Sequence, residues 1–235
     1  MKYFSLLVLA SSFACTAHTA NAQQVGNEGV RLLEFRDVDG TLFKSGNELG
    51  VRGTPMVDDG WGRGTIHFKN GLVFTDTAIN LSLYNGRLYM RRNNRYVEFV
   101  QPAASVSLSF RHEDGSEETR RFHSGLPVWG DQSENTLYEV LFEGQHIELV
   151  AFLRKKVVDP NNYGGPTQKE YSLIRQLFLF QPEEQKIIPL KSYSADALRN
   201  SLPSYSDAIN KFLIDKKNPK NKEQLIELLA FLDKK

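Results

Sequence analysis

The chain has 235 residues, of which 40% are hydrophobic and 24% charged, with 29 basic and 28 acidic side chains. This length and composition are those of a folded globular protein with one substantial core or two small ones. The formal net charge of +1 argues against nucleic acid or an anionic membrane surface as a general partner. The sequence contains no recognisable nucleotide loop, metal-ligand spacing or catalytic motif, so we predict no catalytic residues, no metal and no cofactor.

Residues 1–22 have the plan of a secretory signal peptide, with a lysine near the start, an apolar stretch, and small residues at Ala20 and Ala22. The apolar stretch is too short to span a bilayer, so we expect cleavage after Ala22 rather than a membrane anchor. Lipidation of Cys15 is the alternative, although Ser12 stands where a lipoprotein signal normally has leucine. We therefore predict an exported protein without a transmembrane span, periplasmic or associated with the outer envelope.

Cleavage removes the only cysteine, so the mature chain contains no disulfide. We predict a mainly β fold, α+β overall, for the remainder. Residues 23–191 are expected to form a β-rich body, either an antiparallel β-meander sheet or a partly closed barrel or clam. Residues 192–235 are expected to form a small helical C-terminal appendage, because their apolar residues recur at helical spacing.

Three asparagine turns divide residues 64–100 into antiparallel strands. The turns are Asn70-Gly71, Asn85-Gly86 and Asn93-Asn94. Two-residue hairpin loops favour these residues because both central positions adopt a left-handed backbone. A loop of two residues also fixes which residues pair across the ladder. The expected pairs are Phe68 with Val73, Leu83 with Leu88, Leu81 with Met90, Met90 with Val97, and Leu88 with Phe99.

These pairings define two faces, one apolar and one polar. The apolar face holds Ile66, Phe68, Val73, Ile79, Leu81, Leu83, Leu88, Met90, Val97 and Phe99. The polar face holds His67, Phe74, Asn80, Ser82, Tyr84, Arg87, Tyr89, Arg91, Tyr96 and Glu98. We expect the first face to be buried and the second to be exposed.

The polar face supplies the leading candidates for binding, because interfaces favour tyrosine and arginine. The candidate binding residues are Tyr84, Arg87, Tyr89, Arg91 and Tyr96. The alternative is that sheets favour tyrosine on exposed faces and that arginine stems pack across it.

Further strands are expected from runs of apolar and alternating residues. They are residues 30–38, 105–110, 136–142, 146–158, 169–181 and 186–190. The segment 112–115 is predicted as a hairpin tip. The glycine-rich residues 45–64 are predicted as a long irregular loop that has apolar side chains to bury.

Two irregular segments hold weaker candidates, in loops rather than on the sheet. These candidates are Trp61, His123, Trp129 and Asp131. Beside the first of them, Asp58 and Asp59 suggest a cation or sugar site, although adjacent acidic residues in such a loop are more often turn formers. The other three are close in sequence, but no serine or cysteine nucleophile is placed by a recognisable motif.

The C-terminal part is predicted to form three helices. Ser194 and Ser206 are expected to cap the first two, and Asn221 with Gln224 resembles the capping box of the third. The third helix carries a leucine stripe, made of Leu225, Leu228, Leu229 and Leu232.

Several of these motifs together resemble uncharacterised secreted proteins of Bacteroidota. They are Gly53-Thr54-Pro55, Asp59 and Trp61 ahead of Gly64-Thr65-Ile66, the Asn-Gly hairpins, Tyr138 to Gly144, and the helices of residues 198–232. The resemblance covers residues 51–235. It implies an exported, envelope-associated protein with a β-rich body and a helical C-terminus, and it implies no activity.

The leading hypothesis is a non-enzymatic binding or interaction module of the cell envelope, whose partner is an unknown envelope protein or a small ligand. One alternative is a β-barrel that encloses an apolar small ligand. The second alternative is an envelope hydrolase that uses residues around His123 and Asp131.

Overall fold

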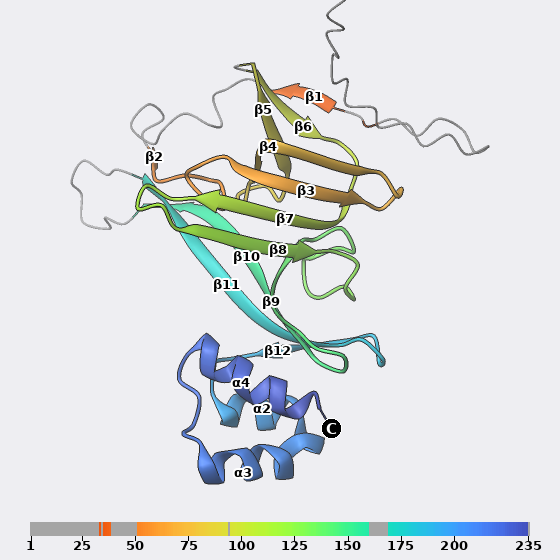
Figure 1. Cartoon of the computed structure of the whole chain (residues 1–235), viewed down its shortest axis with the longest axis vertical. Coiled ribbons are helices and arrows are strands. Elements are labelled where there is room, and N and C mark those ends of the chain that lie inside the picture. The colour runs from red at the N-terminus through yellow and green to blue at the C-terminus, as the bar shows by residue number, and fades with distance from the viewer. Residues whose placement is uncertain (1–32, 34, 39–50, 94, 160–168, 235) are drawn as a thin grey trace, which may run out of the picture. The chain divides into compact units, whose positions relative to one another are not determined.

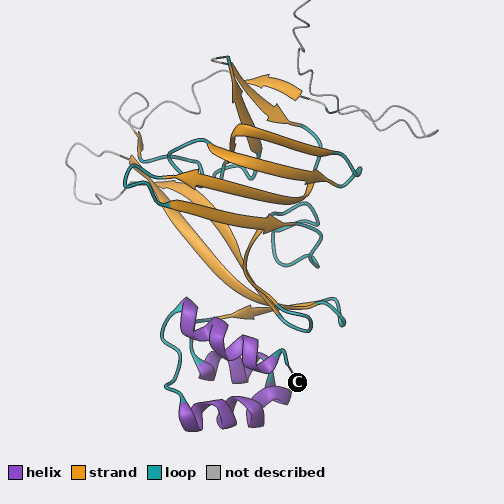
Figure 2. Ribbon diagram, viewed as in Figure 1, coloured by secondary structure: helices purple, strands orange, loops and turns teal. Residues whose placement is uncertain are grey.

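The computed structural model describes residue 33 and residues 35–38, 51–93, 95–159 and 169–234 (Figure 1). The predicted signal peptide and the predicted turn at Asp39-Gly40 lie outside the described residues. The described strands form one 12-stranded sheet that is mostly antiparallel and not closed, and three α-helices follow it (Figure 2). The predicted fold class is thereby confirmed, in its open-sheet form.

The body consists of strands joined by connections of different lengths. In chain order they are β1 (Phe35–Val38), β2 (Val51–Arg52), β3 (Gly62–Phe68), β4 (Val73–Leu81), β5 (Leu88–Arg92), β6 (Arg95–Phe99), β7 (Ala103–Arg111), β8 (Glu117–His123), β9 (Tyr138–Glu143), β10 (Glu148–Val158), β11 (Lys169–Gln181) and β12 (Lys186–Leu190). The order across the sheet is β1-β6-β5-β4-β3-β7-β8-β9-β10-β11-β12, and β2 pairs with β11 in parallel. Most neighbouring strands are therefore consecutive in the chain, although β1 pairs with β6 and β3 with β7, and longer segments join β8 to β9 and β10 to β11.

The hairpin between β3 and β4 has a longer loop than its Asn-Gly sequence predicts. The Gly71 N–H donates to the Phe68 carbonyl at 2.9 Å, and Gly71 adopts a φ of 85°. This is a three-residue loop, in which a left-handed glycine follows a type I turn. His67 therefore pairs with Val73, and the predicted pairing of Phe68 with Val73 is wrong.

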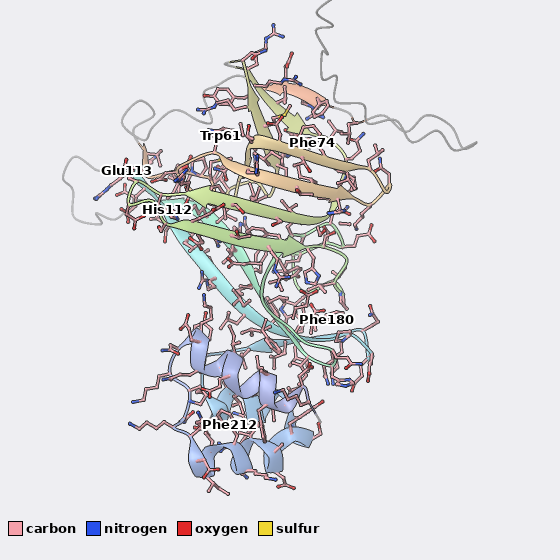
Figure 3. All side chains as sticks on the ribbon, in the orientation of Figure 1. Trp61, Phe74, His112, Glu113, Phe180 and Phe212 are labelled. Carbon is pink, nitrogen blue, oxygen red and sulfur yellow. The ribbon has the colours of Figure 1, made fainter. Side chains whose placement is uncertain are left out.

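The change of register reverses the two faces at the start of β4. Val73, predicted on the apolar face, is 50% exposed. Phe74, predicted on the polar face, packs against the core instead, and its ring centroid lies 5.1 Å from that of Phe99 (Figure 3). A β-bulge, with its extra residue in β4 between Asp76 and Ile79, then restores the phase, so Ile79 and Leu81 are buried as predicted.

The loop between β4 and β5 is also longer than two residues. Leu81 pairs with Leu88 and Ile79 pairs with Met90. The predicted partners were Leu83 for Leu88 and Leu81 for Met90. The register is displaced by two residues, an even number, so each side chain keeps its predicted face. Leu88 and Met90 are buried accordingly.

The hairpin between β5 and β6 keeps the two-residue loop that its sequence predicts. Met90 pairs with Val97, and Asn93 adopts a left-handed φ of 49°. Asn94, the second predicted loop residue, lies outside the described residues. The hairpin tip predicted at residues 112–115 is also present between β7 and β8.

Residues 54–57, which we call the clasp, pair with the end of β4. The Val57 N–H donates to the Leu81 carbonyl at 2.8 Å, and the Leu83 N–H donates to the Pro55 carbonyl at 2.9 Å. The methionine and the valine of the clasp are both buried. The prediction that this glycine-rich segment has apolar side chains to bury is therefore confirmed at Met56 and Val57, but residues 51–52 and 62–64 belong to β2 and β3 and not to an irregular loop.

Lys155 of β10 reaches the clasp from the other half of the sheet. Its backbone N–H donates to the Leu83 carbonyl at 2.8 Å, and its ammonium donates to the carbonyls of Thr54 at 2.9 Å and Met56 at 2.6 Å. Burial lowers the pKa of the Lys155 ammonium, and the nearby Asp59 carboxylate opposes that shift. The clasp thus connects the end of β4 to β10.

The helices form the end of the described chain. They are α2 (Ala195–Ser201), the 3₁₀ turn η2 (Pro203–Tyr205), α3 (Ser206–Asp215) and α4 (Lys222–Leu232). Ser194 and Asn221 cap α2 and α4 as predicted. Ser206 does not cap α3, because η2 precedes it and its backbone is already helical. Every described helix falls short of the length and hydrophobicity that crossing a membrane requires.

The leucine stripe of α4 belongs to the same hydrophobic core as the sheet. All four of its leucines are fully buried, and they cluster with residues of β9, β10 and β11. Beyond α4, the Asp233 carboxylate accepts hydrogen bonds from the backbone N–H groups of Gln145, His146 and Ile147 at 2.7–2.9 Å. The end of the helical segment is therefore fastened to the turn between β9 and β10.

We predict that Asp233→Asn destabilises the protein by about 1.5–3 kcal/mol at neutral pH, because three N–H groups lose an ionised acceptor. Desolvation opposes the shift, but these hydrogen bonds lower the pKa of Asp233 overall. A lowered pKa contributes stability above the unfolded pKa of about 3.9, and that stability is lost as the pH falls through the folded value. Urea unfolding should therefore show the difference from wild type at pH 7 and lose it in strong acid.

The matched control for this prediction is Asp215→Asn, at an exposed aspartate that ends α3. Its effect should be small and, if anything, stabilising, because an aspartate at a helix C-terminus opposes the helix dipole. Equal losses of stability in the two variants would contradict a specific role for Asp233.

Candidate binding site

The centre of the predicted tyrosine and arginine face is buried. Tyr89 is 2% exposed, and Asn80 beside it is 1% exposed. The Asn80 side-chain amide donates to the carbonyls of Asp58 at 2.9 Å and Gly60 at 2.6 Å, so the loop that follows the clasp covers this face. The expectation that the whole face is exposed is therefore wrong at Asn80, Ser82, Tyr89 and Glu98, all of which are buried. At Tyr89, burial raises the pKa of the hydroxyl.

The other candidates from this face lie in different places. Tyr96 and Arg91 both contact Trp61, with the Trp61 and Tyr96 rings 5.7 Å apart and the Arg91 guanidinium 5.5 Å above the indole. Arg87 forms an ion pair with the buried Glu98. Tyr84 lies in the β4–β5 loop. The five residues therefore do not form one continuous surface.

Tyr84 lies against β11, on the other half of the sheet. It is 48% exposed, and its ring meets that of Tyr171 edge-on at 5.8 Å.

Asp58, considered above as a cation or sugar ligand, accepts a hydrogen bond from the Gly60 N–H at 2.8 Å and so acts as a turn former. The described residues contain no group of three histidine, cysteine, aspartate or glutamate side chains that could hold a metal ion.

The three candidates near residues 123–131 contact different partners. His123 Nε2 lies 3.5 Å from Glu148 Oε2, and Asp131 forms an ion pair with Arg154 at 3.1 Å. Trp129 meets Phe178 of β11 edge-on at 6.1 Å. Burial lowers the pKa of His123 and raises that of Glu148, so both neutral forms are favoured.

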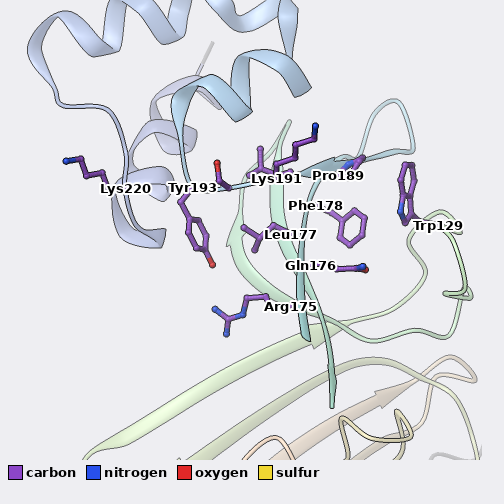
Figure 4. A pocket seen from close by; sticks show the side chains of 11 residues that line it. Trp129, Arg175, Gln176, Leu177, Phe178, Pro189, Lys191, Tyr193 and Lys220 are labelled. Atoms are coloured by element: carbon purple, nitrogen blue, oxygen red, sulfur yellow. The ribbon is translucent and has the colours of Figure 1, made fainter. Parts of the chain in front are cut away.

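Trp129 lines a cavity of about 580 Å³ at the edge of β11, which is the best candidate for a ligand site in the described chain (Figure 4). Its volume lies within the range typical of ligand pockets, about 300–1,000 Å³. We call it the edge cavity. It is lined by Trp129, Arg175, Gln176, Leu177, Phe178, Pro189, Leu190, Lys191, Ser192, Tyr193 and Lys220.

Strand alternation divides the lining of the edge cavity into two sides. Arg175 and Leu177 point to one side of β11, where Tyr193 also lies (Figure 4). Gln176 and Phe178 point to the other side, toward Trp129. The first side is cationic and polar, and the second is largely aromatic.

The charges of the edge cavity have one sign. Its lining includes Arg175, Lys191 and Lys220 and no carboxylate. Arg175 Nη2 lies 3.9 Å from Glu139 Oε2, which is too far for a hydrogen bond. The Tyr193 hydroxyl is buried and has no hydrogen-bond partner among the described residues. The cavity therefore presents positive charge, and a lining residue carries a buried hydroxyl without a hydrogen-bond partner among the described residues.

A second cavity, of about 640 Å³, lies between the β4–β5 loop, residues 131–137 and β10. Its lining contains the ion pair between Asp131 and Arg154, so charges of both signs are already matched there. The edge cavity is therefore the better candidate for a charged ligand.

Glu139 lies near Arg175, a cation of the edge cavity. Its carboxylate is 9% exposed and accepts a hydrogen bond from Arg120 Nε at 2.7 Å. Arg120 also donates to the Val57 carbonyl of the clasp at 3.3 Å. Glu139, Arg120 and Arg175 thus connect the clasp to the cavity.

Sequence reasoning identified Trp129 but missed the other residues of the edge cavity. The available signal was on β11, where Arg175 interrupts an alternating stripe of apolar residues that continues on both sides of it, at Leu173 and Leu177. The remaining lining comes from distant segments that no local pattern connects.

Comparison of the chain with protein-family models, with curated proteins and with solved structures gave no match. Function is therefore inferred from the chemistry of the edge cavity.

We predict that Arg120→Met destabilises the protein by about 3–5 kcal/mol, because it leaves the buried Glu139 carboxylate without its closest partner. The matched control is Arg121→Met on the same strand. Arg121 forms an equally short ion pair with Glu143, but both side chains are more than half exposed. The control should change stability by about 0–1 kcal/mol in urea unfolding.

Proposed function

We propose that the protein is an exported, non-enzymatic binding module of the cell envelope, and that it holds an anionic partner in the edge cavity. The observation that carries this proposal is the lining of the edge cavity, with three cationic side chains and no carboxylate. Arginine and lysine bind carboxylates and phosphates through charge-assisted hydrogen bonds. The export plan of residues 1–22 supports the envelope location.

The aromatic side of the edge cavity adds apolar contact to this charge. Trp129 is 41% exposed although it packs on Phe178, so one part of its ring is available to a ligand. The hydroxyl of Tyr193 offers a hydrogen bond that the described residues do not use. A partner with both acidic and apolar groups would satisfy both sides.

The alternative of an enclosed apolar ligand receives no support from the packing. The apolar face of the meander is filled by its own side chains, such as Ile66 and Ile79, which are fully buried. Both cavities described above have charged side chains in their lining. The hydrolase alternative depends on His123, whose closest charged contact is Glu148 rather than Asp131.

Titration with an acetylated peptide of about five glutamates tests the proposal, since intrinsic fluorescence can report binding at Trp129. Trp61→Phe removes the only other tryptophan. We expect binding that weakens with added salt, because exposed charges are screened. Arg175→Gln combined with Lys220→Glu should weaken it by at least about tenfold.

The matched control carries the same change of charge outside the cavity, Lys186→Gln combined with Lys211→Glu, at two exposed lysines. It should bind within about twofold of wild type. Absence of binding to the wild type, or equal binding by both double variants, would refute the proposed function.

A further inference from the structure

We propose that the open edge of β11 takes up an extended acidic segment of a partner protein as an added β-strand. This inference rests on the proposed function, because it specifies how the edge cavity holds its anionic partner. Three observations support it: one edge of β11 is unpaired along its middle, the side chains that line the cavity alternate between two faces, and the charges of the lining are all positive.

One edge of β11 lacks a strand partner along its middle. β10 pairs with the other edge along eleven consecutive residue pairs. On the open edge, β2 pairs with residues 169–170 and β12 with residues 177–181. Within the described residues, 171–176 therefore pair on one side only, and the backbone N–H and C=O groups of an unpaired edge form a template for another strand.

The sequence of this open stretch does not protect it. β12, an outer strand, contains Pro189, which removes a backbone donor and is typical of sheet edges. Residues 171–176 contain no proline or glycine and only one charge, at Arg175. Leu173 is 47% exposed there. Six such residues match the usual length of a strand, about 5–6 residues.

The lining of the edge cavity matches the two faces of an added strand. Side chains of a strand point alternately to the two faces of the sheet. Where the open stretch borders the cavity, one set would meet Arg175, on the side of Tyr193, and the other would meet Gln176, on the side of Trp129 (Figure 4). A segment that alternates acidic with apolar or aromatic residues fits both sets.

Charge favours another protein over a second copy of this chain as the source of the added strand. Residues 171–176 contain no acidic side chain. Pairing two copies through this edge would bring a second set of the same cations, Arg175, Lys191 and Lys220, toward the first. Cations placed close together repel, whereas an acidic segment would neutralise them.

The test uses labelled peptides of about eight residues, long enough to cover the open stretch. One alternates glutamate with valine, and a second has the same composition in two blocks. Two further peptides keep the alternating sequence but are N-methylated at every second residue, one at the odd and one at the even positions. Fluorescence anisotropy with the full-length protein measures their affinities.

We expect the alternating peptide to bind at least about tenfold more tightly than the block peptide. Only one edge of an added strand hydrogen-bonds to β11, so one methylated peptide should lose about tenfold or more and the other should retain most of its affinity. Arg175→Gln should weaken the alternating peptide about tenfold, whereas Lys186→Gln combined with Lys211→Glu should not. Lys191→Glu combined with Lys220→Glu gives a second test that leaves the contact between Arg175 and Glu139 intact.

Three other results would overturn the proposal. If both methylated peptides bind like the parent, strand addition is wrong while anion binding survives. If neither these peptides nor the glutamate peptide binds, the proposed function fails with it. If sedimentation shows a dimer that the alternating peptide dissociates, the edge is occupied by a second copy rather than by a partner protein.

Discussion

The arrangement of the two halves of the sheet depends on the contact between the clasp and Lys155. Neighbouring strands hold each other through ladders, but β4 and β10 are separated by four strands in the sheet order. They are joined through the Leu83 carbonyl, which accepts from the Lys155 N–H, and through the Lys155 ammonium, which donates to two clasp carbonyls. A half-buried ammonium is stabilised when carbonyls accept its hydrogen bonds, so these two contacts favour this geometry.

The clasp contact also accounts for the burial of Tyr89. The loop that follows the clasp is positioned over β4 and β5, where its carbonyls accept from Asn80. On the other half of the sheet, Arg120 connects the Val57 carbonyl to Glu139, and Glu139 lies beside Arg175. The clasp and the loop that follows it therefore have two roles. The loop covers the face that was predicted to bind, and the clasp contacts Arg120, which connects it through Glu139 to Arg175 of the edge cavity.

The sequence predicted the faces of the meander better than its register, for a physical reason. Asn-Gly fits a two-residue loop, but a glycine in the left-handed position also fits a three-residue loop after a type I turn, so Gly71 alone does not decide between them. The predicted register at this hairpin was wrong by one residue, so Val73 was predicted to be buried but is exposed in the structure. At Leu88 the error was two residues, which leaves the faces unchanged.

The candidate site was less predictable because it is a property of topology. Arg175 is the single charge within residues 171–181 of β11. Nothing local shows that this strand has an open edge, since that depends on where β2 and β12 end. Tyr193 and Lys220 join the site only through the docking of the helices. Local periodicity predicted those helices, including the Asn221 cap and the leucine stripe, but it carries no information on which part of the sheet they approach.

The helical segment therefore contributes to both stability and the site. Its leucines complete the hydrophobic core, and Asp233 fastens its end to the β9–β10 turn. The segment between β12 and α2 supplies Tyr193, and the segment before α4 supplies Lys220. The same docking buries the leucines and brings these two side chains to β11. Loosening the helices would therefore remove part of the cationic side of the edge cavity. Trp129 and Phe178 belong to the body, so their contact would remain.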